Sequence, residues 1–85
     1  MIASGYYTGT WSLTSTLNAP TAYVGHSAIW TGAEMIVWGG SPGVTNEGGR
    51  YDPVTNTWAP TSLTSAPSAR TYHSAVWTGN EMIVW

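Results

Sequence analysis

The side chains of this chain that could do chemistry are few, and they recur at one interval. His26 and His73, the only histidines, lie 47 residues apart (73 − 26 = 47), and Glu34 and Glu81 follow them at the same interval. Imidazole rings can ligate a metal, but a metal site needs three or more converging ligands, and neither unit places a partner carboxylate beside its histidine. A neutral imidazole also serves as a hydrogen-bonding group within a fold. We therefore expect structural roles for both histidines, and neither a metal nor a cofactor.

The carboxylates do not form a catalytic set. Glu34 and Glu81 each follow a tight turn in a separate repeat, whereas general acid–base catalysis needs two carboxylates at a defined separation in one cleft. Asp52 precedes Pro53, and an aspartate in such a turn accepts a hydrogen bond from a backbone N–H two residues further on. Serine and threonine are abundant, but none has a histidine and an acid in register for a triad. We expect no catalytic residue.

Charge is scarce along the whole chain. Arg50 and Arg70 are the only lysine or arginine residues, and the net charge is −2. Two arginines cannot build the basic patch of a nucleic-acid binder, and no apolar run reaches the ~18 residues of a membrane-spanning helix. Only 7% of the residues are charged, against about 25% in an average soluble protein. Something else should cover the apolar surface, either a partner or copies of the chain itself. The lack of cysteine leaves the compartment open.

The histidines and glutamates lie in two copies of a stretch that predicts a β-hairpin. In the first copy, strands over residues 26–31 and 34–39 meet at a two-residue turn, Gly32-Ala33; in the second, which spans 73–85, the turn is Gly79-Asn80. Glycine takes the positive φ of such turns without steric cost. Residues 35–38 are apolar without alternation, which indicates a strand buried on both faces.

The repeat extends beyond the hairpin. Residues 11–38 align on 58–85 with 17 of 28 positions identical, which indicates duplication. After the first hairpin we expect a loop over 41–48, a strand over 49–52, a turn over 53–56 and an outer strand over 57–62. Four short strands in about 47 residues without helical periodicity predict a β-propeller blade.

The unit resembles the kelch repeat. Four apolar residues end in Gly39-Gly40, Tyr51 and Trp58 follow with six residues between them, and Arg70 and His73 precede the next hairpin. The first partial unit departs from the pattern, with Ser4 in the place of the tyrosine and Tyr23 in the place of Arg70. Kelch resemblance implies an all-β propeller of four-stranded antiparallel blades, with about two blades per chain. It also implies that the arginines tie blades together.

The resemblance divides the chain into parts and assigns a binding face. Residues 1–25 would form the outer two strands and crossover of a split blade, 26–62 a complete blade, 63–72 a crossover, and 73–85 the inner two strands of another split blade. In kelch propellers the loops after the second and fourth strands share the usual binding face. Carried over, this places four ligand-binding candidates near that face: His26, Arg70, Tyr72 and His73.

The function expected from these features is a non-enzymatic interaction module that assembles into a ring. Two units would need 2 × 47 = 94 residues, nine more than the 85 present. The inner strands of one copy would therefore pair with the outer strands of the next, in a strand exchange that closes a ring. Three copies would make the six blades frequent in kelch-like rings, and four copies would make eight. Protein or glycan is the expected ligand. An enzyme scaffold of the copper-oxidase or hydrolase-associated kind, and a module that only assembles, are the alternatives.

Overall fold

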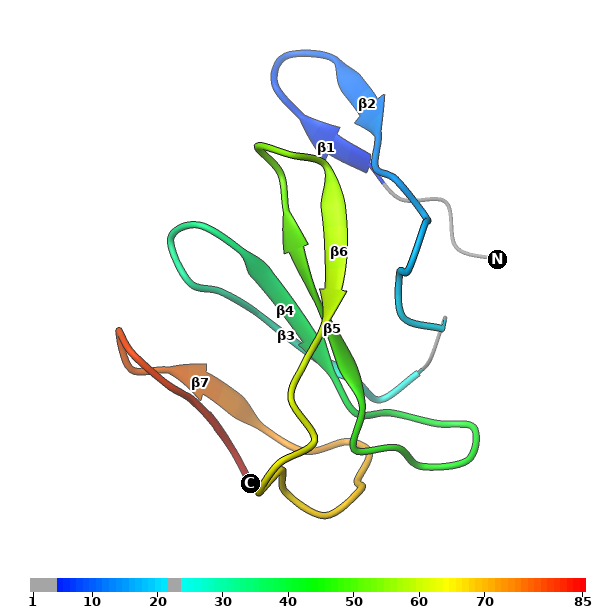
Figure 1. Cartoon of the computed structure of the whole chain (residues 1–85), viewed down its shortest axis with the longest axis vertical. Coiled ribbons are helices and arrows are strands. Elements are labelled where there is room, and N and C mark those ends of the chain that lie inside the picture. Colours follow the sequence, from blue (N-terminus) through cyan, green and yellow to red (C-terminus); the bar gives the residue numbers. More distant parts are fainter. Residues whose placement is uncertain (1–4, 22–23) are drawn as a thin grey trace.

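The computed structural model describes residues 5–21 and 24–85, and these are all-β and antiparallel (Figure 1). No helix occurs within the described part, as the lack of helical periodicity predicts. The eight strands are β1 (Gly5–Tyr7), β2 (Trp11–Leu13), β3 (Ser27–Trp30), β4 (Met35–Trp38), β5 (Gly48–Asp52), β6 (Thr57–Pro60), β7 (Ala75–Trp77) and β8 (Met82–Val84). They form a four-stranded sheet in the order β3-β4-β5-β6 and two separate hairpins, β1-β2 and β7-β8.

Both predicted hairpin turns are confirmed. Gly32 has φ +102° and Gly79 has φ +109°, a region that a residue with a Cβ rarely enters. Thr31 N–H donates to the Glu34 carbonyl at 2.9 Å, and the equivalent bond closes the second turn at the same distance. The threonine hydroxyl also accepts a hydrogen bond from Glu34 N–H at 2.9 Å. The two turns are therefore built alike, as expected from the repeated sequence.

The register of the four-stranded sheet separates its side chains into two faces. Trp30 lies opposite Met35, Met35 opposite Tyr51, and Tyr51 opposite Trp58. Because directly opposed residues share a face and neighbours in a strand alternate, this row lies on one side, which we name the Trp30 face. Ile29, Ile36 and Trp38 lie on the other side, the Trp38 face.

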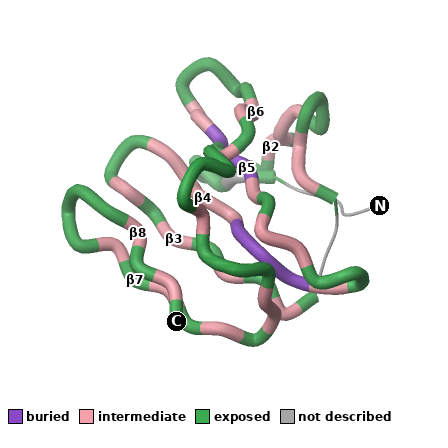
Figure 2. Tube along the Cα trace, turned by 60° about the horizontal axis from the view of Figure 1, so that its bottom comes forward, coloured by how far each residue is buried: buried purple, intermediate pink, exposed green. Residues whose placement is uncertain are grey.

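The two hairpins lie on opposite faces of the four-stranded sheet (Figures 1 and 2). Strand β7 packs against β3 and covers the Trp38 face. On the Trp30 face, the segment after β2 crosses the outer strands, where Trp58 Nε1 donates to the Ser15 carbonyl at 2.8 Å. Ser15 N–H in turn donates to Asn56 Oδ1 at 2.8 Å. Three layers therefore stack, with the sheet in the middle.

Burial in this stack is uneven. Trp38 and Tyr51 form the buried core, each 4% exposed. The expectation that residues 35–38 are buried on both faces is fulfilled only at Trp38, because the other three remain partly exposed. Trp30 is 54% exposed and Trp85 62%, although both occupy positions that recur in the repeat. Each points from a face that no other part of the described chain fully covers.

The first hairpin differs from its expected register. A constant 47-residue offset would place Ser4 opposite Trp11, and Ser4 lies outside the described residues. The structure instead pairs Tyr7 with Trp11, with ring centroids 5.2 Å apart. Tyr51 and Trp58 form the matching pair at 5.0 Å. Three residues join the first pair and six join the second, so Tyr7 takes the place of Tyr51 through a shorter turn.

Candidate functional site

Three segments, 24–27, 38–41 and 70–73, meet at one end of the four-stranded sheet, and we call this meeting point the junction. Gly40 N–H donates to the Arg70 carbonyl at 3.0 Å, and Tyr72 N–H donates to the Gly25 carbonyl at 2.8 Å. Residues 24 and 41 form an isolated antiparallel bridge. The backbone alone thus ties the crossover to both ends of the β3-β4 hairpin. It positions all four predicted ligand-binding residues within one region.

The glycine pair is required by the tightness of the junction. Gly39 has φ +76° and Gly40 has φ +109°. A Cβ on Gly39 would lie 2.9 Å from the Arg70 carbonyl oxygen and 2.5 Å from Cε1 of the His73 ring. Only a residue without a side chain fits there. The predicted structural role of the pair is consistent with this geometry.

His73 uses its ring to join two layers of the stack. Its Nε2 lies 2.8 Å from Ser27 Oγ, and its ring meets Trp38 edge-on with centroids 5.1 Å apart. Burial lowers the pKa of His73 below 6.5, the nearby charges of Arg70 and His26 lower it further, and the Trp38 backbone opposes them. The neutral ring is therefore the favoured form, which suits a hydrogen-bonding role between layers better than an anion-binding one.

The side chain of each arginine makes polar contacts within its own segment or its own sheet. Arg70 Nε donates to the Ser68 carbonyl at 3.0 Å, and its terminal nitrogen donates to Ser68 Oγ at 2.9 Å. Arg50 lies 3.6 Å from Glu34 in a partly exposed ion pair. Both residues of that pair belong to the four-stranded sheet or its turn, so this contact does not tie one sheet to another, as the kelch resemblance implied for Arg50.

Tyr72 and His26 are the junction residues that face solvent. Tyr72 is 79% exposed and has φ +53°, a conformation uncommon for a residue with a bulky side chain. His26 is also exposed. Strained, exposed aromatic residues are frequent at binding loops, and a tyrosine offers both an apolar ring and a polar tip. Of the four candidates, these two are exposed in the single chain, whereas Arg70 and His73 are partly buried.

Tyr51 and Trp58, predicted as structural motif residues, both serve the fold. The Tyr51 hydroxyl donates to Asn56 Oδ1, which holds the turn between β5 and β6. The Trp58 indole N–H reaches the segment after β2. Their ring centroids lie 5.0 Å apart, and the Trp58 side chain links the outer strands to the neighbouring layer.

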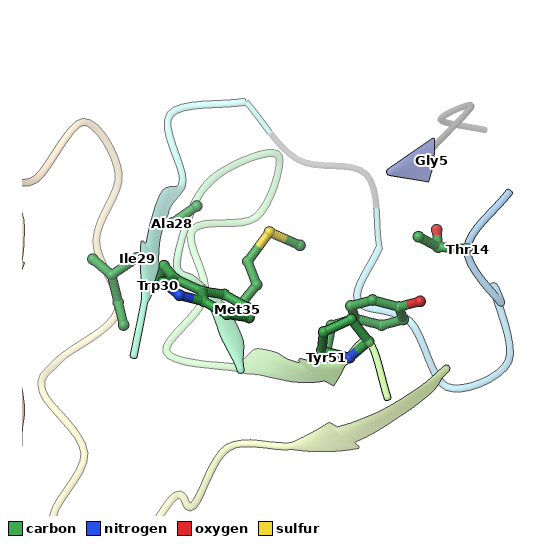
Figure 3. Close-up of a pocket in the computed structure, with 8 residues that line it drawn as sticks. Gly5, Thr14, Ala28, Ile29, Trp30, Met35 and Tyr51 are labelled. Atoms are coloured by element: carbon green, nitrogen blue, oxygen red, sulfur yellow. The ribbon is translucent and has the colours of Figure 1, made fainter. Parts of the chain in front are cut away.

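A groove that sequence reasoning missed lies between the first hairpin and the Trp30 face (Figure 3). It is open to solvent and has a volume of about 570 Å³. Trp30, Met35 and Tyr51 point toward it, while Ile29 points away. Eight residues line it: Gly5, Thr14, Ala28, Ile29, Trp30, Met35, Tyr51 and Pro53. The signal that could have predicted the groove is the pairing of Trp30 with Met35. These are two large apolar side chains on a face that their own repeat unit does not cover.

Neither a metal site nor a membrane-spanning helix emerges from the described residues. No group of three or more histidine, aspartate or glutamate side chains converges among residues 5–21 and 24–85. The same residues contain no helix long and apolar enough to cross a bilayer.

Comparison of the chain with models of known protein families gave no match. Searches of curated proteins and of solved structures also gave no significant match.

Proposed function

We propose that the chain is a kelch-like β-propeller interaction module, without catalytic activity, that closes into a ring by assembling with copies of itself. The observation that carries this proposal is the stacking of one repeat on the next. The hairpin β7-β8 differs from β3-β4 at only two of thirteen positions over residues 26–38 and 73–85, and its strand β7 packs against β3. Identical units stacked face on face are the arrangement from which a propeller is built.

The loops support a binding face at the junction. Arg70 N–H donates to the Thr45 carbonyl at 3.4 Å, which joins the loop after β4 to the crossover after β6. The tight turns at Gly32 and Gly79 lie at the other end of their hairpins (Figure 1). The junction thus presents Tyr72 beside two loops. We propose a protein segment or a glycan as ligand, since an exposed tyrosine stacks on apolar or sugar surfaces and hydrogen-bonds at its rim.

The proposed ring contains two blades per chain. Three copies then make six blades and four copies make eight, both within the range of about four to eight found in propellers. The three-copy ring is the preferred form. The Trp30 face and the far side of β7-β8 would be covered in either ring, which accounts for the low charge content of the chain.

Small-angle X-ray scattering tests the ring. The single chain has a Cα radius of gyration of 12.8 Å. A closed ring gives a distinctly larger radius and a flat, disc-like scattering profile that does not change on dilution. A radius close to that of the single chain at every concentration would refute the ring.

The binding face has its own test. Trp fluorescence is recorded while the chain is titrated with a panel of oligosaccharides and peptides. We expect Tyr72→Ala to abolish any response seen with the wild type and to leave the scattering profile unchanged. Val54→Ala, at an exposed turn far from the junction, is the control. A response that persists in Tyr72→Ala would place the binding face elsewhere.

A further inference from the structure

The groove on the Trp30 face has the character of an unfilled packing site. None of its eight lining residues is charged, and the tyrosine hydroxyl is already used by Asn56. Small-molecule sites combine apolar walls with a few convergent polar groups, which this groove lacks. Its walls suit another apolar surface of the same kind.

The last hairpin carries such a surface. Its face toward β3 holds Ala75, Trp77, Met82 and Val84, all partly buried. Its other face holds Val76, Ile83 and Trp85, which are 44%, 48% and 62% exposed. This second face is mainly apolar, with Ser74 opposite Trp85 as a polar residue at one end. In a single chain it is left open to water, which is costly.

The chain already makes the contact that would cover both surfaces. Residues 47 apart are equivalent, so Ala75 and Trp77 correspond to Ala28 and Trp30, and the hairpin side they occupy corresponds to the Trp30 face. Within the chain, that side packs on the Trp38 face of β3-β4. The two surfaces left open are again one of each kind: a Trp30 face on the sheet, and the equivalent of the Trp38 face on β7-β8.

We propose that the groove is the seat of the β7-β8 hairpin of a second copy of this chain, and that β8 of that copy pairs with β1. The inference rests on the proposed ring and specifies its contact. The hairpins β1-β2 and β7-β8 of one chain lie on opposite faces of its sheet (Figure 2), so this pairing joins two copies. It also covers the free backbone edges of both strands.

The register of the new pair follows from the sheet. Met35 lies opposite Tyr51 and Val37 opposite Gly49. Because Tyr7 pairs with Trp11 as Tyr51 pairs with Trp58, Met82 of the second copy lies opposite Tyr7. A constant 47-residue offset would instead place Met82 opposite Ser4. The two registers differ by three residues, which is about 10 Å along a strand.

Two further contacts repeat in the same arrangement. Trp38 and Ser27 meet His73 within the chain, so Trp85 and Ser74 of the second copy meet His26. The Ser15 carbonyl accepts from Trp58, so the carbonyl of Ser62 in the second copy accepts from Trp11, which is 77% exposed in the single chain. The contact is head-to-tail, because it joins different surfaces of the two copies. Repeated contacts of this kind either close into a ring or extend into a filament, and the proposed ring is the closed form.

Disulfide trapping tests the register, since the chain has no native cysteine. Chains with Met82→Cys are mixed with chains carrying either Tyr7→Cys or Ser4→Cys, and are then oxidised mildly. The expected result is a covalent dimer of the two different chains with Tyr7→Cys and little or none with Ser4→Cys. A dimer with Ser4→Cys alone overturns the register, and an oligomer that gives neither dimer overturns the proposed seat; both results leave the ring standing. A monomer in light scattering overturns the ring as well.

A second variant tests the proposed seat without cysteine substitutions, which could themselves impair folding. Trp85→Lys places a charge on the open face of β7-β8, at a side chain already 62% exposed, so the single chain should fold with an unchanged far-ultraviolet circular dichroism spectrum. We expect this variant to be monomeric. Val54→Lys changes a side chain 91% exposed at the turn between β5 and β6, and should assemble as the wild type does. If the Trp85→Lys variant assembled at the same concentrations as the wild type, the proposed seat would be overturned.

Discussion

The Trp38 ring is met edge-on by the His73 ring, with centroids 5.1 Å apart and an interplanar angle of 83°. This contact joins the four-stranded sheet to the last hairpin at one of the two buried hydrophobic side chains of the described residues. Edge-to-face aromatic pairs are favourable because the positive ring edge meets the negative ring face. The contact thus holds two layers together, through an aromatic residue and a histidine that both recur in the repeat.

Trp38 and Trp85 are equivalent in sequence but should respond differently to truncation. Trp38→Ala should lower the free energy of unfolding by about 3–5 kcal/mol, as for other large core truncations. Trp85→Ala should cost the single chain much less and weaken assembly instead. Urea denaturation at a protein concentration low enough to give monomer measures the first effect. Equal losses of stability for the two variants would contradict the assigned burial.

Gly39 should tolerate alanine less well than Gly43, although both have positive φ, +76° and +78°. A Cβ at Gly43 meets nothing within 4 Å, whereas at Gly39 it meets the Arg70 carbonyl oxygen and the His73 ring. The backbone cost of positive φ is shared, so the difference isolates the steric effect. We expect Gly39→Ala to be less stable by a further ~1–3 kcal/mol, the usual cost of overpacking. Thermal denaturation of the two variants side by side measures this difference.

The stability of the chain should fall as the pH is lowered through the range where His73 titrates. Its pKa in the folded chain lies below the 6.5 of the unfolded chain, mainly because of burial. Between these two values the unfolded state binds more protons, so acid favours unfolding, and stability is complete only above about pH 6.5. Urea midpoints at pH 5.0 and 7.5 measure the effect. His73→Asn should lose most of this dependence and His26→Asn should keep most of it; an unchanged pH profile in His73→Asn would contradict the assignment.

The ion pair between Glu34 and Arg50 should contribute little to stability. The two side chains are 32% and 44% exposed, and the charged atoms are 3.6 Å apart. Exposed ion pairs of this kind contribute between about 0 and 1 kcal/mol. We expect Glu34→Ala to shift the free energy of unfolding by less than about 0.5 kcal/mol, as for ordinary surface changes. A loss comparable to that of Trp38→Ala would mean that the turn depends on this charge.

The hairpins could be predicted from the sequence because their signals are local. Gly32 and Gly79 supply the positive φ of a two-residue turn, and the apolar runs beside them set the strand lengths. The register of the first hairpin was not predictable from a constant offset, because Tyr7 replaces Tyr51 across a turn that is three residues shorter. Turn length sets register, and an alignment without gaps cannot show it.

The candidate site was predictable in place but not in detail. The repeated pattern located the four candidate residues, and the structure brings their segments together at the junction. The repeated pattern could not show that Arg70 would bond to Ser68, because a serine two residues away in sequence competes with any more distant partner for the guanidinium group. Nor could it show the groove, whose walls come from the first hairpin and from the Trp30 face. Such surfaces depend on how layers stack, which local sequence does not specify.

The molar mass of the chain in solution is the sharpest test of ring assembly. Size-exclusion chromatography with multi-angle light scattering is run on the wild-type chain over a hundredfold range of concentration. We expect a single species of about 27 kDa, three times the 9.1 kDa of the chain; a two-copy or four-copy species would still be a closed ring, of four or eight blades, and would change only the blade number. A folded 9.1 kDa monomer at every concentration, or a mass that grows without limit, would contradict the proposed ring.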